Sequence, residues 1–189
     1  MISAVVLAAG RGTRFGSTKQ LFKIEGKPLA QHAIDVATGG GLDEIVIVLG
    51  HDAERVGAAL VLPPNARTVL NERFAEGQST SLAAGIGALD ASSAAAVVLL
   101  GDQPGILPNE VRELVTRFAE IGAPIVRLRY RDGPGPVLLS REIWREVQAL
   151  RGDTGARELF EQHTVEEVAV ERDAPVDIDS PGDVVSSSA

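Results

Sequence analysis

The chain has 189 residues, of which 44% are hydrophobic and 23% charged, as in an ordinary globular domain that can bury a core. Its formal net charge of −8, with no local stripe of basic residues, argues against nucleic acid as a partner. The absence of cysteine excludes disulfides and thiolate metal sites. We therefore expect a cytoplasmic enzyme or binding protein that forms one domain over residues 1–189. The first apolar run is too short to span a membrane, so no membrane association is expected.

Predicted strands and helices alternate along the sequence. Short apolar runs predict strands at residues 2–7, 44–49, 67–70, 95–100, 124–128, 137–139 and 165–170. Apolar residues at helical spacing predict helices at residues 28–37, 53–62, 81–89, 111–118, 141–150 and 154–162, with Asp52, Ser140 and Asp153 as N-caps. This alternation predicts a three-layer α/β fold in which helices cover both faces of a mostly parallel sheet. Ligands bind such sheets at the carboxyl ends of the strands, so the loops that follow the strands are the candidate site.

The loop after the first predicted strand combines small residues with positive charge. Its small residues are Ala8, Ala9, Gly10, Gly12 and Gly16, and its cations are Arg11, Arg14 and Lys19. Small residues let backbone N–H groups approach a ligand, and successive N–H groups form a concave anion site. The combination favours a polyphosphate ligand at this end of the strand.

Other interpretations of this loop fit less well. A dinucleotide fingerprint needs a third glycine at position 15, which is Phe15, and an acidic residue after the second strand, where Gly50 and His51 stand instead. A Walker loop fails because no Gly-Lys-Ser/Thr sequence is present. A plain strand-to-helix turn with solvated arginines stays open.

The segment Leu7–Lys19, followed by Gln20 and Leu21, resembles the Leu-Ala-Ala-Gly-x-Gly-x-Arg-x-Gly-x-x-Lys signature of nucleotidyltransferases. It is most similar to the MobA-like branch and, within it, to the molybdenum cofactor cytidylyltransferase group. The resemblance implies a Rossmann-like nucleotidyltransferase fold and a Mg²⁺-dependent transfer of a nucleotide, CMP from CTP being favoured, to a phosphorylated acceptor, molybdopterin. It also implies a molybdoenzyme as delivery partner. The nucleotide-binding residues implied are Leu7, Ala8, Ala9, Gly10, Gly12 and Lys19, with Lys19 and Arg14 stabilising the triphosphate during catalysis.

Two aspartates are candidate metal ligands. Asp102 follows the predicted strand 95–100 in Gly-Asp-Gln-Pro, where a carboxylate suits a hard cation such as Mg²⁺ or, alternatively, a turn. This motif resembles the metal-binding motif of the family. The late segment 177–183 resembles Asp-x-Asp-Thr-Pro-x-Asp, which gives the second carboxylate to Asp179. For Asp183 a helix-capping role is expected.

The loop after the third predicted strand offers polar groups at the start of a helix. Gly77 is followed by hydroxyl residues, which suit either a ligand or N-capping by Ser79 or Thr80. The stretch resembles the Glu-Gly-x-Ser-x-Ser-Leu element that borders base and ribose. The resemblance assigns nucleotide binding to Asn71, Gly77 and Ser79.

Two later motifs concern the acceptor. The run 152–157 resembles the Gly-Asp-x-Gly-Ala-Arg element, which implies acceptor-binding roles for Asp153 and Arg157. A helix cap for Asp153 and a surface role for Arg157 are the alternatives. The run 133–136 stands where relatives carry Gly-His-Pro, so Gly135 is an acceptor candidate, but the histidine of that loop is missing here.

Several functions stay open at this point. A relative that uses GTP or another phosphorylated acceptor is the nearest alternative, and a catalytically idle nucleotide-binding module is a second. An NAD-dependent oxidoreductase is a third, which the glycine spacing disfavours.

Overall fold

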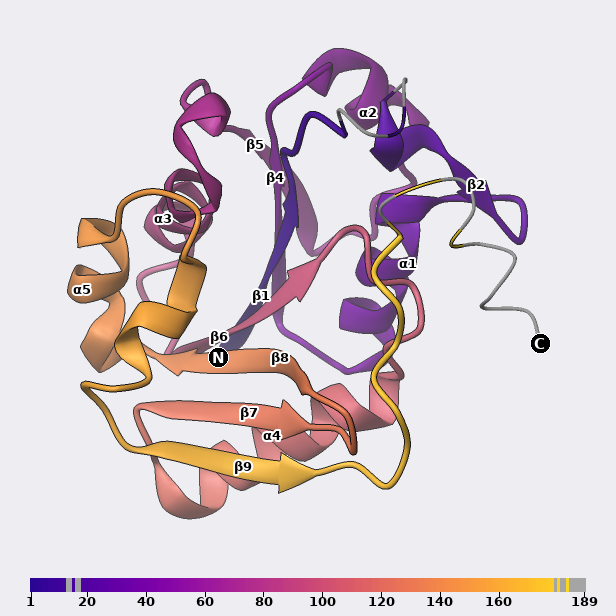
Figure 1. Ribbon diagram of the computed structural model, residues 1–189. Helices are drawn as coiled ribbons and strands as arrows, with labels where there is room; N and C mark the ends of the chain where they lie inside the picture. Colours follow the sequence, from indigo (N-terminus) through magenta and orange to yellow (C-terminus); the bar gives the residue numbers. More distant parts are fainter. Residues whose placement is uncertain (13–14, 16–17, 179, 181–182, 184–189) are drawn as a thin grey trace.

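The computed structural model describes residues 1–12, 15, 18–178, 180 and 183, and its elements appear in Figure 1. A seven-stranded sheet runs through the molecule in the order β5-β4-β1-β6-β8-β7-β9. Its strands are β1 Ile2–Ala8, β4 Glu44–Leu49, β5 Ala66–Leu70, β6 Ala95–Leu100, β7 Ile125–Arg129, β8 Pro134–Ser140 and β9 Val165–Ala169. A small hairpin of β2 Lys23–Ile24 and β3 Lys27–Pro28 lies outside this sheet.

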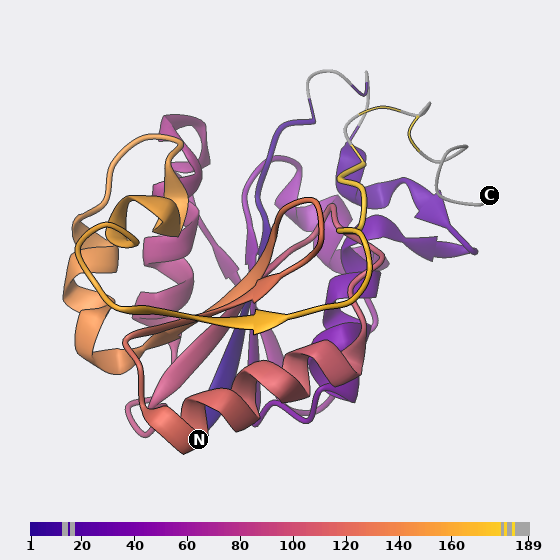
Figure 2. The ribbon, with the colours of Figure 1, turned by 60° about the horizontal axis from the view of Figure 1, so that its bottom comes forward.

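Helices cover both faces of the sheet, which gives three layers (Figures 1 and 2). One face packs against α1 Leu29–Gly39, α2 Ala53–Ala59 and α4 Pro108–Ile121, and the other against α3 Gln78–Ala88 and α5 Trp144–Ala149. Short 3₁₀ helices complete the chain at η2 Lys19–Leu21, η3 Phe74–Glu76, η4 Arg141–Ile143 and η5 Gly155–Leu159. The predicted mostly parallel, three-layer Rossmann-like fold is confirmed.

The central strand β1 supplies both cores because side chains alternate along a strand. Ala4 and Val6 point to the core under α1 and α4, whereas Val5 points to the core under α3. All three are fully buried. A sheet buried on both faces needs apolar strands, which is why β1, β4 and β6 are mostly hydrophobic, with Ser3 and Glu44 as polar residues at the amino ends of β1 and β4.

Among the described residues, every pairing in the large sheet is parallel except the two made by β8. β8 runs antiparallel to β6, with Val137 opposite Val98 and Ser140 opposite Ala95. The amino end of β8, at Pro134, therefore lies at the same edge of the sheet as the carboxyl end of β6. The reversal brings residues 133–136, at the amino end of β8, to the edge where parallel α/β sheets bind ligands.

A buried carboxylate secures the opposite edge of the sheet. Glu44, 7% exposed, accepts hydrogen bonds from Arg67 at 2.5 Å, Ser3 at 2.9 Å and the Asp90 N–H at 3.1 Å. Burial raises the pKa of Glu44, but these donors outweigh it and hold the pKa below its usual value. The cluster ties β1, β4 and β5 together at their amino ends.

Two predicted helices differ from the structure. The predicted helix 53–62 ends at Ala59, and Asp52 does not cap it, because Asp52 has a left-handed backbone and its carboxylate accepts from Thr18 Oγ1 at 2.7 Å. The predicted helix 154–162 is the short 3₁₀ helix η5, and Asp153 caps a different element, as described below. In both cases the carboxylate accepts a hydrogen bond from a residue far along the chain and none from the backbone of the helix that local sequence assigns to it; Asp52 also pairs with Arg55 of α2.

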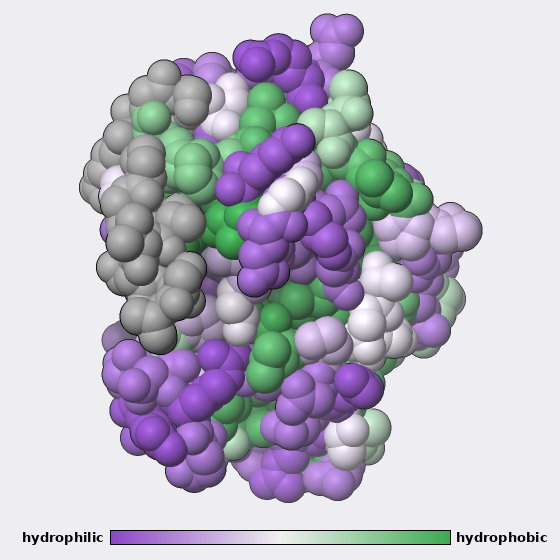
Figure 3. Space-filling model, turned by 90° about the vertical axis from the view of Figure 1, so that its right-hand side faces the viewer, coloured by the Kyte–Doolittle hydropathy of each residue, from purple (hydrophilic) through white to green (hydrophobic). Residues whose placement is uncertain are grey.

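The surface carries mixed polarity on the side that Figure 3 shows, where hydrophilic residues interrupt the apolar ones. Within the described ranges, no helix combines the length and the apolar character that crossing a membrane requires.

Candidate active site

The loops that follow β1, β5 and β6 gather with the turn before β8 at one edge of the sheet. In Figure 2 the loop that leaves β1 and residues 174–178 lie on the side opposite the N-terminus. These loops contain the predicted nucleotide- and metal-binding residues that the structure describes, whereas Asp153 and Arg157 belong to the 150–157 loop. Their geometry is set by a small number of backbone and side-chain contacts.

Lys19 and Asp102 form an ion pair that joins the first loop to the loop after β6. Lys19 Nζ donates to Asp102 Oδ2 at 2.9 Å, and the side chains are 9% and 38% exposed. The 3₁₀ helix that carries Lys19 is fixed on both sides, since Thr18 bonds Asp52 and Gln20 Nε2 donates to the Gly10 carbonyl at 2.7 Å. A buried ammonium group and a half-exposed carboxylate thus meet at the strand ends.

Gly101 explains how the two loops come so close. A Cβ at this position would lie 3.1 Å from the Leu7 carbonyl oxygen and 3.2 Å from the Ala8 side chain. The Gly101 N–H donates to the same Leu7 carbonyl at 2.9 Å. A side chain would push the β6 loop away, so glycine keeps Asp102 beside the first loop.

Gly12 adopts a left-handed backbone in the first loop, with φ of 57°, and its carbonyl accepts from the Phe15 N–H at 2.8 Å. Among the predicted members of this loop, Leu7 and Ala8 end β1, and Ala8 and Ala9 are buried. Arg14 lies outside the described residues.

The C-terminal segment, residues 171–178, passes alongside Asp102. Ile178 N–H donates to the Asp102 carbonyl at 3.0 Å, and Gln103 Nε2 donates to the Pro175 carbonyl at 3.3 Å. Asp179, the predicted second carboxylate, lies outside the described residues. Its described neighbour Ile178 is nevertheless fully buried and hydrogen-bonded beside Asp102.

A buried cluster anchors the start of this segment. Glu110, 2% exposed, receives two hydrogen bonds of 2.8 Å from the Arg172 guanidinium and one of 2.9 Å from the Tyr130 hydroxyl. The Arg172 guanidinium also lies 5.0 Å from the centre of the Tyr130 ring. Burial, and then the Glu110 carboxylate, raise the pKa of Tyr130, so the phenol stays protonated. Sequence reasoning missed this cluster because its members come from three separate elements.

The donor set at Asp102 suits Mg²⁺ better than a softer metal. The described residues contain no group of three or more His, Cys, Asp or Glu that would enclose an ion. Mg²⁺ characteristically takes one or two carboxylates, keeps water ligands and shares the phosphates of its substrate. A single accessible carboxylate next to a lysine therefore fits a cation that arrives with a polyphosphate.

The 71–80 loop carries the other predicted nucleotide residues. Asn71 is 5% exposed, and its amide donates to Thr80 Oγ1 at 2.9 Å and Ser81 Oγ at 3.0 Å, which holds the loop against α3. Ser79 is fully buried in the first turn of α3, and its hydroxyl makes no hydrogen bond to the residues described. Gly77 has φ of 119°. Asn71 thus stabilises the loop through its hydrogen bonds. The buried Ser79 hydroxyl, in contrast, has no hydrogen-bond partner among the described residues.

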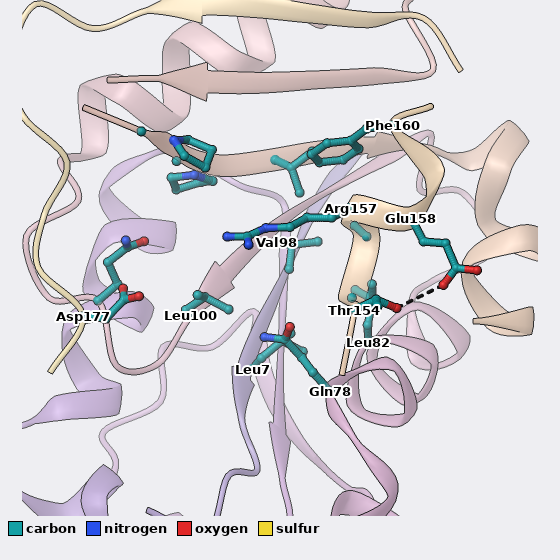
Figure 4. A pocket seen from close by; sticks show the side chains of 18 of the residues that line it. Leu7, Gln78, Leu82, Val98, Leu100, Thr154, Arg157, Glu158, Phe160 and Asp177 are labelled. Carbon is teal, nitrogen blue, oxygen red and sulfur yellow. Dashed lines mark hydrogen bonds between the residues drawn. The ribbon is translucent and has the colours of Figure 1, made fainter. Parts of the chain in front are cut away.

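A cavity of about 830 Å³ adjoins these loops (Figure 4). Its apolar lining includes Leu7, Leu82, Val98, Leu100, Pro134, Pro136 and Phe160. All three predicted acceptor residues, Gly135, Asp153 and Arg157, also line it. Arg157 extends into the cavity, and within the described chain its guanidinium makes no hydrogen bond or ion pair.

Gly135, the second residue of β8, packs too closely against its neighbours to carry a side chain. A Cβ there would lie 2.4 Å from the Tyr130 ring and 2.9 Å from the Leu128 side chain. Sequence reasoning did not single out Gln103 or Asp177 for this cavity, although both line it. The available signal was their position in sequence, since Gln103 directly follows Asp102 and Asp177 lies two residues before Asp179.

The structure is an α/β fold in which the Lys19–Asp102 ion pair, at the carboxyl ends of the strands, lies beside a cavity of mixed polarity. The family model of the MobA-like NTP transferase domain matches residues 4–168. The chain therefore belongs to the MobA-like NTP transferase family, whose members are nucleotidyltransferases.

The chain is similar in sequence to two kinds of curated protein, the bifunctional protein GlmU and a nicotine blue oxidoreductase. The chain is 33% identical over 135 residues to the bifunctional protein GlmU of Sorangium cellulosum, a match that covers 67% of this chain and 28% of that protein. The chain thus spans little more than a quarter of this relative. It is also 31% identical over 173 residues to the nicotine blue oxidoreductase of Paenarthrobacter nicotinovorans, covering 85% of this chain and 82% of that protein.

Among solved structures, the fold is similar over almost its full length to Rv0371c of Mycobacterium tuberculosis. That comparison has a TM-score of 0.85 at 34% identity and covers 98% of this chain and 95% of the other. A complex of Rv0371c with manganese matches with a TM-score of 0.81 at 31% identity and covers 98% of this chain and 96% of the other.

Proposed function

We propose that this protein is a Mg²⁺-dependent nucleotidyltransferase that moves a nucleotide, CMP from CTP, onto a phosphorylated acceptor, molybdopterin. The observation that carries the proposal is the Lys19–Asp102 pair at the end of β1 and β6. It places a cation for phosphate and a carboxylate for a metal ion at one point. The MobA-like family membership supports the same reaction class.

In the proposed reaction an oxygen of the acceptor phosphate attacks the α-phosphorus of the triphosphate. The new P–O bond forms as the bond to the β-phosphate oxygen breaks, and pyrophosphate leaves with that electron pair. Because the acceptor oxygen arrives ionised, no general base is required, and catalysis consists of positioning and charge stabilisation. Lys19, with Arg14, binds the phosphates and stabilises the charge that develops on them.

Asp102 and Asp179 are the residues that would hold the cation. A bound divalent ion supplies charge neutralisation and orientation for phosphate oxygens. The manganese complex of Rv0371c supports divalent-metal binding on this fold. Gly10 and Gly12 would leave room for the phosphates, while Gly77 and Ser79 would border the base and ribose.

The cavity lined by Gly135 and Arg157 is the proposed acceptor site. Its apolar wall suits a flat ring system, and the unpaired guanidinium of Arg157, within the described residues, suits a phosphate through paired N–H donors. The proposal also includes a cytoplasmic location, where such triphosphates are made, and delivery of the product to a molybdoenzyme.

Calorimetric binding of CTP, GTP, UTP and ATP, each with and without Mg²⁺, tests the proposal. Mg²⁺-dependent binding of CTP, followed by pyrophosphate release on adding molybdopterin, is the expected result. Tight binding of GTP and not of CTP would identify GTP as the nucleotide donor. If none of the four triphosphates binds, the proposal is overturned.

A nicotinamide-dependent oxidoreductase is the second candidate. The similarity to nicotine blue oxidoreductase, which covers most of both chains, favours it. The loop after β4 carries Gly50 and His51 where a dinucleotide site would place an acidic residue, which argues against it. Binding of NAD(H) or NADP(H) in the same calorimetric series, with no triphosphate binding, would establish this candidate.

A further inference from the structure

Two loops of the site are joined directly, although they are far apart in the chain. Gln78 N–H donates to Asp153 Oδ1 at 3.1 Å across a separation of 75 residues, and Ser79 N–H donates to the Gly152 carbonyl at 3.1 Å. These N–H groups belong to the first turn of α3, which has no partners within its own helix. The 150–157 loop therefore caps the helix that begins in the 71–80 loop.

Glycines allow this close fit. A Cβ on Gly77 would lie 2.4 Å from the Gly152 carbonyl carbon, and a Cβ on Gly155 would lie 2.8 Å from Gln78 Oε1. All three glycines have positive φ, at 119°, 75° and 56° for Gly77, Gly152 and Gly155. A side chain at Gly77 would collide with the backbone of Gly152 and separate the loops, whereas at Gly155 the positive φ is what favours glycine.

Charge strengthens the same contact. Hydrogen bonds from Arg73, and the nearby guanidinium of Arg151, lower the pKa of Glu76. The Asp153 carboxylate lies at the amino end of α3, where the helix dipole favours negative charge. Glu76 and Arg151 are therefore one pair of opposite charges between the two loops, and the Asp153 carboxylate adds a favourable interaction with the helix dipole.

We propose that Asp153 is a positioning residue that couples nucleotide binding to the placement of Arg157 in the acceptor cavity. The inference rests on the proposed function, in which Ser79 borders the nucleotide. A ligand that fixes Gln78 and Ser79 also fixes Asp153, and Arg157 follows four residues later in η5. Coupling of this kind is reciprocal, so an occupied acceptor cavity also strengthens nucleotide binding.

Hydrogen–deuterium exchange of the full chain, with and without CTP and Mg²⁺, tests the coupling. In the unmodified protein CTP is expected to protect both residues 77–82 and residues 150–157. In Asp153→Ala the protection is expected at 77–82 but not at 150–157. Gln78→Pro removes the N–H group that donates to Asp153, and proline is tolerated at the first position of a helix. This variant is expected to show the same pattern of protection as Asp153→Ala.

Nucleotide affinity gives a second readout. Loss of the cap is expected to weaken CTP binding about fivefold in Asp153→Ala, because a helix cap contributes about that factor. Asp153→Asn, which keeps the acceptor oxygen, should restore most of the affinity and of the protection at 150–157. The double variant Asp153→Ala, Gln78→Pro should be no weaker than either single variant, since both remove one hydrogen bond.

Asp90→Asn is the matched control. Asp90 also accepts a backbone N–H, from Ser92 at 2.8 Å, but in the turn before β6, at the opposite edge of the sheet. It should leave CTP binding and both protected regions unchanged.

The outcomes separate the two proposals. Protection at 77–82 without protection at 150–157 in the unmodified protein, or equal protection of both in Asp153→Ala, would overturn the coupling and leave the nucleotidyltransferase proposal intact. Absence of protection by every triphosphate would overturn the proposed function and the coupling with it.

Discussion

Lys19 Nζ donates to Asp102 Oδ2 at 2.9 Å, and this one contact joins the loops that follow the two central neighbouring strands β1 and β6. Both groups have charges that a triphosphate and its cation require. In the absence of ligand the Lys19 ammonium and the Asp102 carboxylate attract each other, so a bound triphosphate or cation would compete with this ion pair.

Replacement of Lys19 by methionine is expected to lower the rate of pyrophosphate release about 100- to 1000-fold, since one group that stabilises developing charge is removed. The same variant should bind Mn²⁺ more tightly than the unmodified protein in the absence of nucleotide, because Asp102 no longer faces an ammonium. Enzyme kinetics and the paramagnetic signal of free Mn²⁺ measure the two effects. Lys27→Met, at an exposed pair with Asp35, is the control and should change neither.

Asp102→Asn is expected to lower the turnover rate about 100-fold or more, while the fold persists. The asparagine keeps the shape of the side chain but loses the charge for the metal. Pyrophosphate release and circular dichroism check the two parts. A variant that releases pyrophosphate at the unmodified rate would contradict the assignment of Asp102 to the metal.

Arg157→Ala is expected to raise the KM for the acceptor about 10- to 100-fold and to leave triphosphate affinity within about twofold, because a charge-assisted hydrogen bond contributes that much. Steady-state kinetics and calorimetry separate the two substrates. Arg145→Ala, exposed on α5, serves as the control. An equal loss of triphosphate affinity would place Arg157 on the nucleotide instead.

Stability should fall in acid partly through Glu44. Its pKa in the folded protein lies below the ordinary value of 4.5, so its contribution is complete above that pH and is lost as the pH falls through the folded pKa. Glu44→Gln should cost about 1–3 kcal/mol at pH 7, and the difference should shrink below about pH 4. Urea unfolding between pH 3 and pH 7 measures this difference in the free energy of unfolding, with the exposed Glu113→Gln as control. A difference that does not change with pH would contradict the lowered pKa of Glu44.

Two glycines of α3 provide a matched pair for packing. A Cβ at Gly85 would lie 2.3 Å from Val5 Cγ1, whereas at Gly87 the nearest atom is the flexible Gln148 Nε2 at 3.3 Å. Gly85→Ala should therefore destabilise by about 1–3 kcal/mol, since it overpacks the core between helix and sheet. Gly87→Ala should stabilise by up to about 1 kcal/mol, as alanine favours helix. Thermal unfolding of both variants measures the two changes in stability. Equal changes would contradict the close packing of Gly85 against Val5.

Local sequence was sufficient to determine the layered fold and the edge at which the site lies. Apolar runs such as Glu44–Leu49 and Ala95–Leu100 predict buried strands, because both faces of a parallel sheet are covered. The carboxyl ends of parallel strands meet at one edge, so Gly10, Lys19 and Asp102 were expected together before any coordinates.

Only the tertiary structure determined which groups are partners at that edge. The reversal of β8, the bond from Thr18 to Asp52 and the cap that Asp153 gives α3 all join residues that are distant in the chain. Periodicity and capping rules describe neighbours within a helix or strand, and so they assigned Asp52 and Asp153 to their own following helices. In the folded chain Asp52 accepts a hydrogen bond from the Thr18 hydroxyl, and Asp153 accepts one from the Gln78 N–H at the start of α3. Rules about neighbouring residues cannot predict either contact.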